Sequence, residues 1–202
     1  MIPFGDPSAS YQAHKSEIDQ AIQRVLDSGW YVLGTEVDTF EKEFASFHGE
    51  DFHAVGVANG TDAIALCLRA LGLGVGDEVI TPSHTAVATV AGIEQAGCTP
   101  VFADIDPNTR CIAPKSIEER LGSNTRAIMP VHIYGQPAEM YKILEIAQAY
   151  NLAVVEDCSQ AHGGAIFVKN KSYSVGSFGD VATWSFCTDK IISTGGEGGM
   201  VT

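Results

Sequence analysis

Apolar and polar positions along the chain first predict two helices. Residues 15–28 carry apolar side chains on one helical face, and Gly29 marks the end of that helix. A second helix ends at Gly49. Its apolar face consists of Val37, Phe40, Phe44 and Phe47. The loop between them, GWYVLG, is either a hydrophobic tether or a contact with a ligand or a second subunit, because exposed aromatic side chains are enriched at interfaces.

From residue 54 onwards, short apolar strands alternate with helices. The predicted strands are 54–58, 78–81, 100–105, 126–131, 152–155 and 181–186, and the predicted helices are 63–71, an alanine-rich helix ending at Ala96, 114–121 and 137–150. This alternation predicts an α/β fold with a largely parallel sheet covered on both faces. The runs AVGVA, AIMPV and LAVV are apolar throughout, as expected for strands buried on both faces.

Polar motifs follow several of the predicted strands. They are NGTD at residues 59–62, Ser83 with His84, HIYG at residues 132–135, and Asp157. Parallel sheets bind their ligands beyond the carboxyl ends of the strands. The sequence therefore predicts a ligand site where these motifs meet.

Composition and charge limit the classes of ligand. The chain has 202 residues, of which 45% are hydrophobic, and a formal net charge of -13. This charge disfavours nucleic acids and anionic membranes as partners. An anionic small molecule remains a possible ligand, because a helix N-terminus can bind it.

The cysteines and the length of the apolar runs indicate the cellular compartment of the protein. The five cysteines are odd in number and show no C-x-x-C spacing, so we expect no metal site and no disulfide framework. We see neither a signal-peptide pattern at the start nor an apolar run of about 20 residues, the length needed to span a membrane. We therefore expect a cytoplasmic protein with reduced thiols.

A lysine and an aspartate are the main candidates for chemistry. Lys190 lies in a glycine-rich loop after the strand 181–186. Burial can lower the pKa of a lysine amine from about 10.4 and allow it to form a Schiff base with a carbonyl compound. Most lysines are solvated surface charges, so Lys190 alone is weak evidence for a site. The presence of Asp157 upstream strengthens that evidence. Asp157 ends a buried strand and needs a partner, which would be a cofactor ring nitrogen, a salt bridge or a helix cap.

The remaining candidates are suited to a phosphate. Gly60, Thr61 and Asp62 precede a predicted helix, whose free N–H groups and dipole favour a phosphate. The alternative is a plain N-cap by Thr61 or Asp62. The hydroxyl of Ser185, at the end of the last predicted strand, could hold a phosphate oxygen.

Three further side chains are suited to a flat ring. His84 could stack on such a ring or be an ordinary hydrogen-bonded histidine, and Gln160 and His162 could hydrogen-bond a ring substituent. A phosphate cradle, a carboxylate, a flat side chain and a lysine at strand ends are the arrangement expected for pyridoxal 5'-phosphate.

Several longer segments carry a family resemblance. They are GWYVLGTEVDTFEKEFA, ANGTDAIALCLRALGLGVGDEVITPSHTAVATV, GCTPVFADIDP, VVEDCSQAHGG and GSFGDVATWSFCTDKIISTGGEGG. In content, order and spacing the chain resembles the DegT/DnrJ/EryC1/StrS family of pyridoxal phosphate-dependent sugar aminotransferases. The resemblance implies the type I aminotransferase fold, a three-layer αβα sandwich with a mixed, mostly parallel sheet. It also implies a smaller C-terminal domain, which this chain would lack.

The resemblance also implies roles for the candidates. Lys190 would hold the cofactor as a Schiff base and shuttle a proton, and Asp157 would keep the ring nitrogen protonated. The cofactor phosphate would be bound by Gly60, Thr61, Asp62 and Ser185. His84 would stack on the ring, and Gln160 would lie against the ring and its 3-hydroxyl. A related dehydratase branch has histidine in place of the lysine, so Lys190 favours transamination.

The resulting functional expectation concerns amino sugars. We expect an amino group to move from glutamate or glutamine to a keto-sugar nucleotide or cyclitol ketone, in amino-sugar, polysaccharide or secondary-metabolite biosynthesis. We expect a homodimer and one incomplete large domain over residues 1–202, beginning with helices over residues 1–50. The motif combination disfavours a lyase or desulfurase on the same fold. A truncated, non-catalytic pyridoxal phosphate-binding or regulatory relative remains the alternative, with weak cofactor binding and little turnover.

Overall fold

The computed structural model describes residues 6–168 and 171–202. The chain divides into two compact units, one ending at Gly56 and one comprising Val57–Thr202. All the candidate site residues belong to the second unit. No helix among the described residues has the length and apolar character needed to cross a membrane.

The first unit is helical. Its helices are α1 (Pro7–Ala13), α2 (Lys15–Ser28) and α3 (Thr35–His48). The predicted bounds of α2 are confirmed, and both α2 and α3 are followed by a glycine with positive φ, Gly29 at 67° and Gly49 at 145°. Helix α1 was not predicted; it begins at a proline and is capped by the Asp6 side chain.

The main sheet is mixed and mostly parallel, as predicted. Within the described residues it has seven strands in the order β1-β9-β8-β5-β4-β2-β3. They are β1 (Val55–Val57), β2 (Glu78–Pro82), β3 (Thr99–Ala103), β4 (Thr125–Ile128), β5 (Ala153–Asp157), β8 (Val181–Ser185) and β9 (Gly199–Val201). The pairs from β3 through β2, β4 and β5 to β8 are parallel, whereas β9 runs antiparallel to β8.

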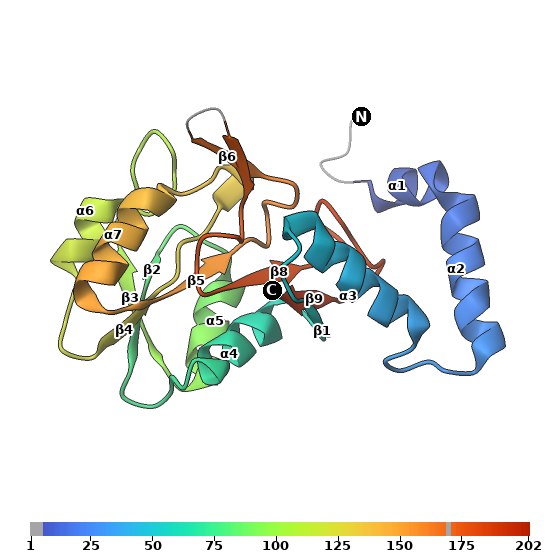
Figure 1. The fold of residues 1–202 in the computed structure, drawn as a ribbon, viewed down its shortest axis with the longest axis horizontal. Coiled ribbons are helices and arrows are strands. Elements are labelled where there is room, and N and C mark those ends of the chain that lie inside the picture. Colours follow the sequence, from blue (N-terminus) through green and yellow to red (C-terminus); the bar gives the residue numbers. More distant parts are fainter. Residues whose placement is uncertain (1–5, 169–170) are drawn as a thin grey trace. The chain divides into compact units, whose positions relative to one another are not determined.

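Helices cover both faces of the sheet (Figure 1). They are α4 (Gly60–Ala70), α5 (Val87–Ala96), α6 (Pro114–Glu119) and α7 (Met140–Tyr150), with a short 3-10 helix η1 (Ile133–Gly135) after β4. Neighbouring strand residues point to opposite faces. Ile80 packs with α6 and α7, whereas Val79 packs with α4 and α5. The resulting αβα sandwich confirms the predicted fold class.

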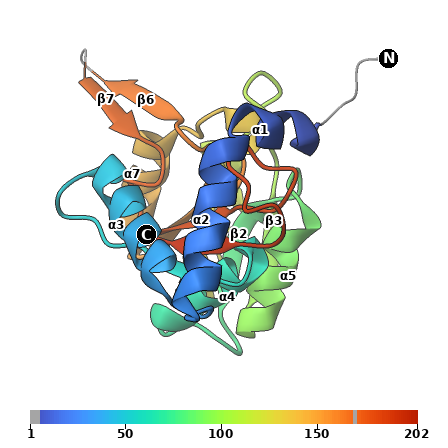
Figure 2. The same cartoon turned by 90° about the vertical axis from the view of Figure 1, so that its right-hand side faces the viewer.

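A small hairpin lies outside this sheet. Strands β6 (Ala165–Val168) and β7 (Lys171–Ser174) pair antiparallel, with Ala165 opposite Ser174 (Figure 2). These two strands were not predicted from the sequence. Each has four residues and carries exposed side chains, so the apolar pattern is weak.

Candidate active site

A cavity of about 490 Å³ lies at the carboxyl ends of β5 and β8. The predicted residues that line it are Gly60, Thr61, Asp62, Asp157, Gln160, Ser185 and Lys190. These residues come from the start of α4, from the end of β5 and the loop that follows it, and from the end of β8 and the loop that follows it. The volume falls in the usual range for small-molecule sites, about 300–1,000 Å³.

The N-terminus of α4 forms one wall of this cavity. Asn59 is the N-cap, and its Oδ1 accepts a hydrogen bond from the N–H of Asp62 at 2.8 Å. The expectation of a cap by Thr61 or Asp62 was wrong, and α4 begins at Gly60 rather than at residue 63. The N–H groups of Gly60 and Thr61 have no helical carbonyl to bind, so they are available to an anion.

A glycine lets this helix approach β8 closely. A Cβ on Gly60 would lie 2.7 Å from the Ser185 Cβ, so a larger residue would push the two elements apart. The Ser185 side chain lines the cavity beside the free N–H groups of α4. Backbone donors, a hydroxyl and a helix N-terminus together suit a phosphate group.

Asp157 is buried at the end of β5, with 3% of its surface exposed. Its Oδ2 accepts a hydrogen bond from Thr89 Oγ1 at 2.8 Å, and its Oδ1 accepts one from the Ser159 N–H at 3.1 Å. Among the described residues no lysine, arginine or histidine forms an ion pair with Asp157. A buried carboxylate that faces a cavity and forms no ion pair is suited to a ligand that brings a positive charge.

Lys190 contributes the amine of the site. Its side chain is 15% exposed, and its Nζ lies 3.5 Å from Asp189 Oδ2. The backbone N–H of Lys190 donates to the Cys187 carbonyl at 3.0 Å, which holds the loop in a tight turn. Other charged residues in the lining are acidic, namely Asp62, Asp157, Asp189 and Glu197.

His162 lies behind the cavity wall rather than in it. Its ring packs between those of Trp184 and Phe186, at centroid distances of 5.5 and 5.4 Å. Burial lowers the pKa of His162 to about 4, and the nearby positive charge of Lys190 acts in the same direction. The ring is therefore neutral at pH 7, and it is not placed to bond a ligand in the cavity.

Gln160 and His84 meet the same strained residue. Gln160 Oε1 accepts the Tyr134 N–H at 2.9 Å, and Tyr134 has a left-handed backbone with φ of 56°. This contact turns the amide N–H₂ of Gln160 away from Tyr134, on a side chain that lines the cavity. The His84 ring packs edge-on against Tyr134 at 5.7 Å and does not line the cavity. Stacking by His84 therefore remains a prediction.

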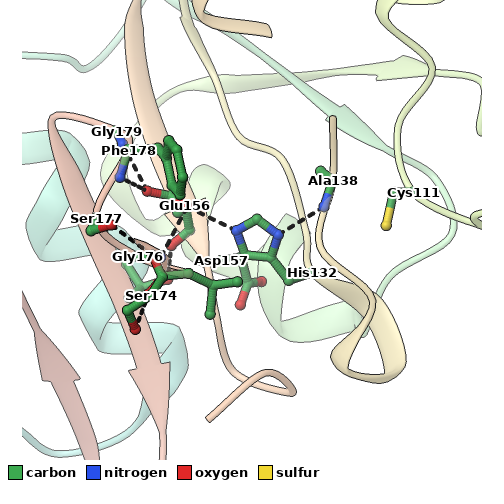
Figure 3. A network of polar contacts seen from close by, with 12 residues as sticks. Cys111, His132, Ala138, Glu156, Asp157, Ser174, Gly176, Ser177, Phe178 and Gly179 are labelled. Carbon is green, nitrogen blue, oxygen red and sulfur yellow. Dashed lines mark hydrogen bonds and ion pairs between the residues drawn. The ribbon is translucent and has the colours of Figure 1, made fainter. Parts of the chain in front are cut away.

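A buried network lies on the opposite side of β5, where Glu156 points away from Asp157 (Figure 3). Glu156 Oε2 accepts from His132 Nε2 at 2.9 Å and from the Gly176 N–H at 3.0 Å. Its Oε1 accepts from the Phe178 and Gly179 N–H groups at 2.8 and 2.7 Å. Burial alone would raise the pKa of Glu156, but these hydrogen bonds outweigh it and the pKa lies below its usual range.

The same network argues against a metal centre. Ligand atoms of His132, Glu156 and Cys158 lie within 4.8 Å of one another. Nδ1 of His132 already accepts the Ala138 N–H at 3.0 Å, and both Glu156 oxygens are hydrogen-bonded. Burial and the nearby carboxylates raise the pKa of the Cys158 thiol, so a thiolate ligand is disfavoured. We interpret this group as a support for β5.

Sequence reasoning missed this network and the partners of Asp157. Thr89 lies 68 residues before Asp157 in an alanine-rich helix, and nothing in the local sequence marks it. The adjacent pair Glu156-Asp157 was a usable signal, because alternate strand residues face opposite sides and two buried carboxylates need two sets of partners.

The fold and the donor set define a class of protein. An αβα sandwich with a lysine, an unpaired buried carboxylate and an anion cradle at one cavity is suited to pyridoxal phosphate. The model of the DegT/DnrJ/EryC1/StrS aminotransferase family matches residues 12–202. The chain belongs to this family.

Individual relatives agree with this assignment. The chain is 50% identical over 202 residues to the dTDP-3-amino-3,6-dideoxy-alpha-D-galactopyranose transaminase of Aneurinibacillus thermoaerophilus, covering 100% of this chain and 54% of that protein. The crystal structure of S. venezuelae DesV with a ketimine intermediate superposes with a TM-score of 0.93 at 43% identity, covering 100% of this chain and 53% of DesV.

A third match carries a bound cofactor. NtdA from Bacillus subtilis, solved with bound cofactor PMP, has a TM-score of 0.90 and 33% identity, over 100% of this chain and 44% of NtdA. The chain spans about half the length of the relatives that it matches.

Proposed function

We propose that this chain is the cofactor-binding part of a pyridoxal phosphate-dependent aminotransferase. Its substrates would be glutamate or glutamine as amino donor and a keto-sugar nucleotide or cyclitol ketone as acceptor. The observation that carries the proposal is the meeting of Lys190, Asp157 and the α4 N-terminus at one cavity. Membership of a family whose members include dTDP-sugar transaminases supports the substrate class.

Pyridoxal 5'-phosphate, when bound, supplies an aldehyde that condenses with amines and a ring that accepts electron density. The Nζ amine of Lys190 would anchor the cofactor covalently and carry a proton between the reacting carbon atoms. Asp157 Oδ2 and Oδ1 would hold a proton on the ring nitrogen through the charge of the carboxylate. The N-terminus of α4 and the Ser185 hydroxyl would bind the phosphate.

Other residues would complete the pocket. The amide N–H₂ of Gln160 would donate to the oxygen substituent of the ring, because its Oε1 already accepts the Tyr134 N–H. A lysine at position 190 supports transamination over dehydration, since a dehydratase branch of the family carries a histidine there.

We further propose that the protein acts in the cytoplasm as a homodimer, and that the N-terminal helices belong to the same large domain as the sheet. The five cysteines are all free, and four of them are buried, which suits a reducing compartment. The acidic cavity lining supports the dimer, because a nucleotide diphosphate needs positive charge that a second subunit or further chain would supply.

Covalent trapping tests the central proposal. The chain is mixed with pyridoxal 5'-phosphate, reduced with borohydride and mapped by mass spectrometry. We expect a pyridoxyl adduct on Lys190 and none on Lys115, an exposed lysine outside the cavity. The Lys190→Arg variant should lose the adduct. Labelling scattered over surface lysines, or none at all, would count against the proposed function.

A further inference from the structure

Two threonines link the cavity wall to the buried carboxylate of Asp157. Thr89 Oγ1 lies 2.8 Å from Asp157 Oδ2, and Thr85 Oγ1 lies 2.7 Å from Thr89 Oγ1. Both threonines line the cavity, and Thr89 is 1% exposed. The three side chains therefore form a continuous series of hydrogen bonds from the loop just before α5, through α5, to the end of β5.

The number of hydroxyl protons fixes the direction of the hydrogen bonds among these three side chains. An ionised carboxylate only accepts hydrogen bonds, so the single hydroxyl proton of Thr89 is donated to Asp157. The hydrogen bond between the two threonines must then run from Thr85 to Thr89. Each hydroxyl polarises the next, which strengthens the bond that reaches the carboxylate.

The charged groups around Asp157 make the hydroxyl donor of Thr89 important. Glu156 and Cys158 flank it in the chain, and the charged groups that share its cavity are Lys190 and the carboxylates of Asp62, Asp189 and Glu197. Apart from Lys190, the groups that are charged in this set are negative, and a carboxylate cannot donate a hydrogen bond to Asp157. Among the described residues, Thr89 Oγ1 and the Ser159 N–H are the groups that donate to the Asp157 carboxylate.

We propose that Thr89, supported by Thr85, is a positioning residue that holds the Asp157 carboxylate in place and oriented toward the ring nitrogen of the cofactor. This inference rests on the proposed function. Thr89 acts through Asp157, so its effect should appear only with a ligand whose ring can take a proton. A purely structural role would affect every ligand of the cavity equally.

Two ligands separate these alternatives. Pyridoxal 5'-phosphate has a basic ring nitrogen, whereas its 1-deaza analogue has a C–H in the same place. Dissociation constants of both are measured for the unaltered chain and for Thr89→Val, which keeps the shape of the side chain and removes the hydroxyl. We expect Thr89→Val to lower the preference for pyridoxal 5'-phosphate over the analogue about tenfold, as for loss of a hydrogen bond to a charged group.

Three further variants complete the design. Thr89→Ser keeps the donor and should retain the preference. Thr85→Val removes the second hydroxyl and should lower the preference about two- to threefold, because it acts one bond further away. Thr81→Val is the matched control, since Thr81 is also buried but donates to the Met129 carbonyl at 3.0 Å. Circular dichroism checks that each variant folds, and Thr85→Val carries the test if Thr89→Val does not.

The outcomes distinguish this inference from the function on which it rests. A preference unchanged in Thr89→Val and Thr85→Val, or lowered equally in Thr81→Val, would overturn the role of the threonines and leave the proposed function intact. Failure of the unaltered chain to bind either ligand would overturn both. A selective loss of the preference that serine restores would establish Thr89 as a positioning residue.

Discussion

Replacing Glu156 with glutamine tests the support behind β5 most directly. The side chain is fully buried, and its two oxygens accept hydrogen bonds from His132 and from the N–H groups of Gly176, Phe178 and Gly179. Glutamine has nearly the same shape, but one of its two polar ends is a donor. The substitution therefore changes hydrogen bonding and charge while leaving the packing almost unaltered.

The loss of stability caused by Glu156→Gln can be estimated from the buried donors that lose an acceptor. The glutamine oxygen satisfies one pair of donors, and the N–H₂ group then faces the other pair. His132 cannot adapt, because moving its proton from Nε2 to Nδ1 would place two donors, the Nδ1–H and the Ala138 N–H, against each other. Two buried donors without acceptors cost about 1–3 kcal/mol each. We expect Glu156→Gln to lower the free energy of unfolding by about 3–4 kcal/mol, which lies within the sum of these two costs.

The stability that Glu156 contributes depends on pH, and the sign of this dependence follows from its pKa. The pKa of Glu156 is lower in the folded chain than in the unfolded chain, so the unfolded chain binds more protons in acid. The stability that Glu156 contributes is complete above the ordinary glutamate pKa and is lost as the pH falls through the folded pKa. The difference between the unaltered chain and Glu156→Gln should therefore shrink in acid.

Urea unfolding followed by the fluorescence of buried Trp184 measures this difference. Glu94→Gln is the matched control, because Glu94 is an exposed residue of α5 and the same chemical change there should alter stability by less than about 0.5 kcal/mol. A Glu156→Gln variant as stable as this control, or a deficit that persists unchanged in acid, would refute the account of the network.

Two further predictions concern the cavity wall. Gly60→Ala should lower stability by about 1–3 kcal/mol in urea unfolding and weaken cofactor binding, because the added Cβ would lie 2.7 Å from the Ser185 Cβ. Gly196→Ala, where no described residue beyond the two chain neighbours has an atom within 4 Å of the added Cβ, should change little, and equal effects of both substitutions would contradict a steric cause. Because the pKa of His162 is lowered to about 4, the unfolded chain takes up the proton first, and stability should fall by about 2 kcal/mol between pH 7 and pH 5. His162→Phe should remove this loss, and an unchanged pH slope in that variant would show that other groups cause it.

Helices and strands could be predicted where the apolar pattern was long and was bounded by turn residues. The bounds of α2 follow from its apolar face and the glycine after it. The start of α4 was misplaced by three residues, because Asn59 caps the helix through its side chain and the residues after it look like a turn. The β6–β7 hairpin was missed because its short strands bury little apolar surface.

The site was readable only in part. Lys190, Asp157 and the NGTD motif could be found because each follows a strand, and parallel strands end at one edge of the sheet. The contacts between distant elements could not, since the rotation of α5 decides whether Thr89 or a neighbouring alanine meets Asp157. The edge-on contact of His84 with Tyr134 likewise depends on a left-handed residue that the sequence does not mark.

The adjacent acids of β5 also bear on how the sheet chooses its strand alignment. Strands that are apolar on both faces tolerate a shift of one residue in their pairing, because no apolar side chain is moved from the core to solvent. In β5 such a slip would turn Asp157 toward the donors that bind Glu156 and would bring Glu156 to the cavity. The shorter aspartate would leave several of those N–H groups without an acceptor. The Glu156-Asp157 pair thus penalises misaligned versions of the sheet while the chain folds, before any ligand is present.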